Sequence, residues 1–134
     1  MFDIKNGLNR FLSGSIDFIS DTYKKDGIEK MDCLSLENIL PWFLKQKEIY
    51  PDAVSGILMK FKVVQETEKT FIRKVRKEFF NSMSEHGYIQ ILLDDQDREI
   101  KDEKGKMVLR YFEAKEVDSE IIDLFADNNI IRFD

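Results

Sequence analysis

The 134-residue sequence predicts a small α+β protein, with N-terminal helices packed against a small antiparallel sheet and a C-terminal helix. Two patterns indicate this class. Apolar residues recur every three or four positions through much of residues 2–86, which is the period of an amphipathic helix. Short apolar runs separated by charged turns then fill about residues 88–113, as expected for antiparallel strands. Because the helices precede the strands instead of alternating with them, a doubly wound parallel sheet is not expected.

Length and composition favour one folded domain over residues 1–134. The chain is 43% hydrophobic and holds 11 Phe, but only 2 Pro and 6 Gly, unlike a disordered chain. The start, Met1–Gly7, lacks the basic-then-apolar profile of a signal peptide, and no apolar run approaches the ~20 residues that cross a bilayer. We therefore expect a cytoplasmic protein without membrane contact.

The first half of the chain predicts helices. Residues 2–24 form one helix or two helices split at Gly14, with a shared apolar face of Leu8, Leu12, Ile16, Ile19 and Tyr23. Residues 24–32 are predicted as turn and loop. The next helix is capped by Ser35 or Asn38 and ends near Glu48. Pro41 fits the first turn after Asn38, but would kink a helix that begins at Ser35.

Residues 53–86 favour two helices broken near Gln65–Thr67, with one long helix as the alternative. A short strand also stays open, because apolar residues alternate with Lys60 and Lys62 there. The pair His86-Gly87 predicts the end of this helical region, with Gly87 in the left-handed conformation that commonly follows a last helical turn.

The last third predicts strands and one helix. A strand over 88–93 precedes the turn 94–97, and a hairpin pairs 98–101 with 106–112 around the turn 102–105. Asp118 or Ser119 caps a helix to about Asp127, and 130–133 adds an edge strand. The residues of this helix expected to face inward are Val117, Ile121, Leu124 and Phe125.

No catalytic constellation is visible, so we expect no enzyme, no cofactor and no metal. His86 is the only histidine and shows no partner for acid–base chemistry, and Cys33 is a lone thiol without a nearby activating base. The acidic turn at 94–99 lacks the glycine and glutamate positions of a calcium-binding EF-hand loop. An enzyme whose carboxylates act through a geometry hidden in the sequence is the third-ranked alternative.

A basic helix suggests nucleic-acid binding as the second-ranked alternative. Over 68–85 its polar face carries side chains that can contact phosphates and bases, namely Thr70, Arg73, Lys74, Lys77 and Asn81. The order helix, glycine, strand, charged connection, strand resembles the arrangement of winged-helix proteins in general. However, the connection from 94 to 105 is rich in acids, which DNA phosphates would repel.

Charge separation favours a protein partner instead. Residues 51–86 carry a net charge of +2 and residues 87–134 a net charge of −6. Around the last helix an acidic face is expected on one side, at spacings of three and four: Glu116, Glu120, Asp123 and Asp127. Such a face steers a basic partner toward itself. We therefore predict a regulatory protein-binding module whose partner is a protein with a basic surface, and a small acidic inhibitor is one form of such a module. Trp42 is expected in the core, not at an interface.

Overall fold

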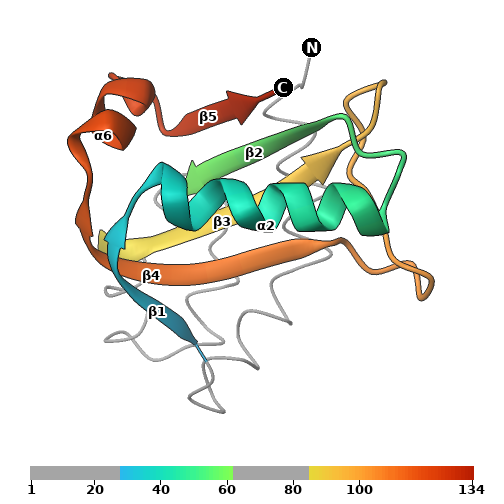
Figure 1. The fold of residues 1–134 in the computed structure, drawn as a ribbon, viewed down its shortest axis with the longest axis horizontal. Coiled ribbons are helices and arrows are strands. Elements are labelled where there is room, and N and C mark those ends of the chain that lie inside the picture. Colours follow the sequence, from blue (N-terminus) through green and yellow to red (C-terminus); the bar gives the residue numbers. More distant parts are fainter. Residues whose placement is uncertain (1–27, 62–84) are drawn as a thin grey trace, which may run out of the picture.

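The computed structural model describes residues 28–61 and 85–134, whose arrangement Figure 1 shows. The helices predicted over 2–24, and nearly all of the basic helix over 68–85, lie outside these residues. The described part contains both helices and strands, which confirms the α+β class. Its elements follow in the order β1 (Glu29–Leu34), α2 (Leu36–Ile49), β2 (Ser55–Lys60), β3 (Gly87–Leu93), β4 (Leu109–Val117), α6 (Ser119–Phe125) and β5 (Ile130–Phe133).

All five strands form one mixed sheet in the order β1-β4-β3-β2-β5. β1 pairs with β4 in parallel, with Met31 opposite Ala114. The other pairs are antiparallel, and β5 pairs with β2. Helix α2 crosses one face of this sheet, while α6 connects β4 to β5 at one end (Figure 1). The sheet is therefore built mainly by pairing of strands that are far apart in the sequence, and not by the predicted hairpin of 98–101 with 106–112.

The prediction of a small antiparallel sheet confined to about 88–113 is wrong. β1 occupies part of the predicted loop 24–32 and extends beyond it. β2 occupies part of the region 53–86, for which helices were favoured, and at Met59 and Lys60 it overlaps the short strand that was left open there. β2 was misassigned because it is buried on both faces, with Ile57, Leu58 and Met59 each at most 1% exposed. Such a strand shows no alternation of apolar and polar residues, so periodicity does not distinguish it from a buried helix.

Helix α2 begins after Ser35, so of the two predicted caps Ser35 has the right position. Its side chain makes no capping hydrogen bond, and the helix contains Pro41. Proline has no N–H to donate to the carbonyl four residues earlier, which weakens backbone bonding in this part of the helix. The next two backbone carbonyls, those of Asn38 and Ile39, accept side-chain donors from the sheet. Arg110 Nη1 lies 3.1 Å from the Asn38 carbonyl oxygen and Gln90 Nε2 lies 3.3 Å from the Ile39 carbonyl oxygen.

The core between α2 and the sheet is formed by Ile39 and Phe43 of the helix against strand residues that include Leu58, Leu92 and Phe112. Phe43 approaches the backbone of β2 so closely that a β-carbon at Gly56 would collide with its ring. Trp42 is partly buried and packs at the border of this core, edge-to-face with Phe43. The opposite face of the central strands is buried as well, through side chains that include Ile57, Met59, Ile89 and Ile91.

The C-terminal elements begin at the predicted positions. Asp118 caps α6 by accepting a hydrogen bond from the Glu120 N–H, and Ile121 and Phe125 are buried. Leu124, predicted to face inward, is 47% exposed. The helix ends at Ala126, whose φ is 49°, before it reaches Asp127.

Gly87 is the first residue of β3, and its predicted left-handed conformation is wrong. Only Gly105 has a positive φ among the described glycines. Gly105 belongs to the predicted turn 102–105, which a bridge between Lys101 and Met107 closes. The turn was therefore predictable from its own residues, whereas the backbone conformation of Gly87 at the start of β3 was not.

Candidate functional site

The four acidic-face residues lie on three different elements. Glu116 lies near the end of β4, Glu120 and Asp123 lie on α6, and Asp127 follows the helix. The prediction that they share one helical stripe is therefore wrong. It failed because α6 has only seven residues, so neither end of the stripe is helical. All four side chains are nonetheless exposed. The segment 116–127 that carries them lies at the α6 end of the sheet (Figure 1).

The acidic face has no ion-pair partner among the residues that the structure describes. Within 28–61 and 85–134, arginine ion pairs engage other carboxylates, namely those of Glu29, Asp94, Asp97 and Asp134. No ion pair in these ranges reaches any acidic-face residue. Glu120 and Asp123 are three residues apart on α6 and are therefore neighbours on its outer side. Among the described residues no ion pair compensates these charges, so α6 and its two flanks present a negative surface.

Exposed aliphatic side chains accompany these acids. Ile122 is 56% exposed and Leu124 is 47% exposed, on the two flanks of the buried ridge of α6. Leu124 lies one helical turn from Glu120, so an apolar side chain and a carboxylate share the same surface. Protein interfaces combine apolar contact with polar and charged residues at the rim. The composition of α6 therefore fits an interface as well as a solvated helix.

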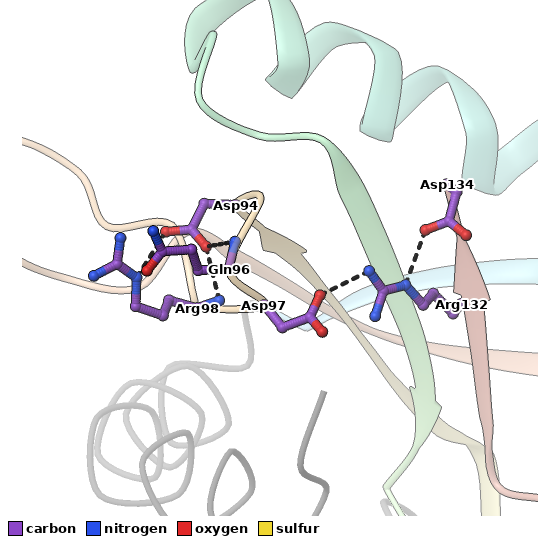
Figure 2. Close-up of polar contacts among 6 residues, drawn as sticks. All are labelled: Asp94, Gln96, Asp97, Arg98, Arg132 and Asp134. Atoms are coloured by element: carbon purple, nitrogen blue, oxygen red, sulfur yellow. Dashed lines mark hydrogen bonds and ion pairs between the residues drawn. The ribbon is translucent and has the colours of Figure 1, made fainter. Parts of the chain in front are cut away.

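The acidic turn at 94–98 is a structural unit of a different kind (Figure 2). The Asp94 carboxylate accepts the N–H groups of Gln96 at 2.8 Å and Arg98 at 2.9 Å, and it pairs with the Arg98 Nε at 3.1 Å. The hydrogen bond from the Arg98 backbone is the main cause that lowers the pKa of Asp94. This carboxylate therefore holds its own turn in place.

Arg132 ties the same turn to the edge strand β5 (Figure 2). Its Nη2 lies 2.7 Å from the Asp97 Oδ1, and its Nε lies 2.9 Å from the Asp134 Oδ1. The hydrogen bond from Arg132 holds the pKa of Asp97 at about 2, well below its usual range. Asp94 and Asp97 therefore stabilise the fold, in contrast to the carboxylates of the acidic face.

His86 lines a hollow of about 360 Å³ beside the β1–β4 edge, together with Lys30, Met31, Asp32, Glu113, Ala114 and Lys115. Its Nε2 lies 3.6 Å from the Glu85 carboxylate. Lys30 stands opposite Glu113 on the neighbouring strand, so basic and acidic groups alternate around the hollow. The described lining contains no hydroxyl or thiol nucleophile that His86 would activate. Cys33, which does not line this hollow, is a half-buried free thiol.

Thr70, Arg73, Lys74, Lys77 and Asn81 all lie outside the described residues, so nucleic-acid binding through them stays a prediction. The β3–β4 pair that would form the two-stranded unit of a winged helix does exist. It lies in the interior of the five-stranded sheet, however, with further strands on both sides.

No helix in the described ranges is long and apolar enough to cross a membrane. No group of three His, Cys, Asp or Glu side chains suited to a metal ion occurs there either. Comparisons with protein families, with curated proteins and with solved structures found no match. The exposed surfaces of the described residues are therefore the evidence for function.

Proposed function

We propose that this protein is a non-enzymatic protein-binding module that captures a partner with a basic surface through the acidic face. The observation that carries the proposal is the set of four exposed carboxylates, Glu116, Glu120, Asp123 and Asp127, without an ion pair inside the described chain. Arginines of the described chain pair with Glu29, Asp94, Asp97 and Asp134. The acidic face receives no such arginine, so its charge is available to another molecule.

Uncompensated charge of one sign accelerates encounter with a partner of the opposite sign, because the field acts before contact is made. Ile122 and Leu124 then supply apolar area that loses water on contact, which slows dissociation. A module that covers a basic active surface of its partner in this way also inhibits that partner. Inhibition is the regulatory role that the proposal implies.

The test is capture of the partner from native lysate by the tagged full-length chain, with and without nuclease. We expect a stoichiometric protein that survives nuclease treatment and is released by high salt. The double variant Glu120→Lys with Asp123→Lys should lose it. The matched control, Asp95→Lys with Glu103→Lys, makes the same charge change at exposed positions of the 94–108 loop and should retain it.

Two results would count against the proposal. Equal loss in both double variants would mean that only the net charge matters. Full capture by the Glu120→Lys, Asp123→Lys variant would show that the acidic face is not the binding surface. If the captured material is nucleic acid instead, the basic helix over 68–85 becomes the first region to mutate.

A further inference from the structure

A second surface lies between α2 and the edge strand β5. A groove of about 130 Å³ runs there, lined by Leu40, Phe43, Leu44 and Lys47 of the helix, by Gly56, and by Phe133 and Asp134. Leu44 is 63% exposed and Leu40 is 37% exposed. Large aliphatic side chains beside an apolar groove lose water when another chain fills it, so this is a place where binding is favourable.

The groove runs beside β5, the last strand of the sheet among the described residues. β5 stands last in the strand order, and within the described ranges β2 is its only partner (Figure 1). The outer N–H and C=O groups of an edge strand are a template on which a further strand can pair. Recognition by strand addition combines such an edge with pockets that take alternate side chains of the added strand. β5 supplies the edge, and the groove beside α2 supplies the pocket.

The charges around the groove select the chemistry of the added strand. Glu37 and Glu48 are exposed and share the flank of α2 that carries Leu40 and Leu44. Positions 37, 40, 44 and 48 follow one another at steps of three or four residues, which places them on one side of a helix. Asp134 adds a third carboxylate, although it already binds Arg132. Lys47 is the one basic residue lining the groove among the residues described. The balance is acidic, so a basic segment is favoured over an acidic one.

We infer that β5 and the α2–β5 groove bind an extended segment of a partner protein in which apolar residues alternate with Lys or Arg. The segment pairs with the outer edge of β5 through its backbone. Its apolar side chains enter the groove beside Leu44 and Phe133, while its basic side chains meet Glu37 and Glu48. None of the groove residues belongs to the acidic face, so the inference does not depend on the proposed function.

Defined peptides test the inference on the full-length protein. The probe is a fluorescein-labelled peptide of about six residues, a common strand length, that alternates Val and Lys, and its counterpart alternates Val and Glu. Fluorescence anisotropy should show binding of the lysine peptide and at least about tenfold weaker binding of the glutamate peptide. Equal binding of the two peptides, or no binding of the lysine peptide, would overturn the inference.

Backbone pairing is tested by N-methylation of alternate residues, because N-methylation removes the N–H donors along one edge of the peptide. Methylation in one register should abolish binding and methylation in the other should preserve it, since a strand pairs through only one of its edges. If the two registers bind equally well or fail equally, strand addition is wrong.

A pair of matched variants locates the site. Leu44 and Ile49 are both exposed, at 63% and 55%, and lie on the same helix, but only Leu44 lines the groove. Leu44→Gln should weaken lysine-peptide binding by about tenfold while Ile49→Gln leaves it unchanged, with folding checked by circular dichroism. The Glu120→Lys, Asp123→Lys variant should bind the peptide like the wild type. Equal loss in Leu44→Gln and Ile49→Gln, or loss in the acidic-face variant, would contradict the proposed position of the site.

Discussion

The Gln90 side chain offers the sharpest test of how α2 is held on the sheet. It is fully buried, donates to the Ile39 carbonyl at 3.3 Å and accepts from Arg110 Nη1 at 2.9 Å. Truncation by Gln90→Ala removes one neutral hydrogen bond, worth about 1 kcal/mol, and one bond from a charged donor, worth about 1.5 kcal/mol or more. Buried stem atoms are lost as well, so we expect the free energy of unfolding to fall by about 3 kcal/mol.

The measurement is urea unfolding followed by circular dichroism, where a lower midpoint with an unchanged slope reports lost stability. The control is Glu29→Gln, which removes the exposed ion-pair partner of the same Arg110, 2.8 Å away. Glu29 is 50% exposed, so this change should cost less than about 1 kcal/mol. If Gln90→Ala costs no more than Glu29→Gln, the buried network does not hold α2 in place.

Three further changes have expected outcomes that follow from single side chains. Ser55→Ala should raise the free energy of unfolding by about 1 kcal/mol in thermal denaturation, since the buried Ser55 hydroxyl has no hydrogen-bond partner among the described residues; a loss of stability would contradict this. Ala126→Gly should add about 1 kcal/mol in urea unfolding by relieving a φ of 49°, and no gain would show that Ala126 is unstrained. The pKa of Asp97 is lowered from 3.8 to about 2 in the fold, so its ionised form contributes stability above about pH 4 that is lost as the pH falls toward 2. Asp97→Asn should therefore destabilise the protein at neutral pH and flatten the decline of stability between pH 4 and 2, whereas an unchanged decline would refute the role of Arg132.

Local chemistry explains which elements could be predicted. Asp118 caps α6 and Gly105 allows the turn before β4, and both act within a few residues of the chain. β3 also stood out as a short apolar run bounded by the acidic turn at 94–97. Sequence reasoning works at these places because the deciding interactions are themselves local.

The strands β1 and β2 were missed for opposite reasons. β2 is apolar on both faces, so Ile57, Leu58 and Met59 show neither helical nor alternating exposure. β1 is an edge strand in which Lys30 and Asp32 are exposed, and it resembles a loop until β4 is known to lie beside it. Its parallel pairing joins residues about 83 positions apart, such as Met31 and Ala114, and no local pattern encodes that contact.

The candidate surfaces follow the same division. Composition identified the acids of the acidic face, but the end of α6 at Ala126 decides that Asp127 leaves the helix. The α2–β5 groove could not be predicted from the sequence, because Leu44 and Phe133 line the same groove only when β5 is paired with β2. The exposure of acids within one segment follows from its composition, whereas a groove lined by two distant segments depends on how the strands pair.

The most direct test of the acidic face is the association rate with the captured partner at about 0.1 M and about 1 M salt, where the Debye length falls from about 10 Å to about 3 Å. For the wild type we expect the rate constant to fall by about tenfold or more between these conditions. The Glu120→Lys, Asp123→Lys variant should associate slowly at low salt and respond little to added salt. A wild-type rate that does not depend on salt, or a variant that matches the wild type in both conditions, would contradict binding through the acidic face.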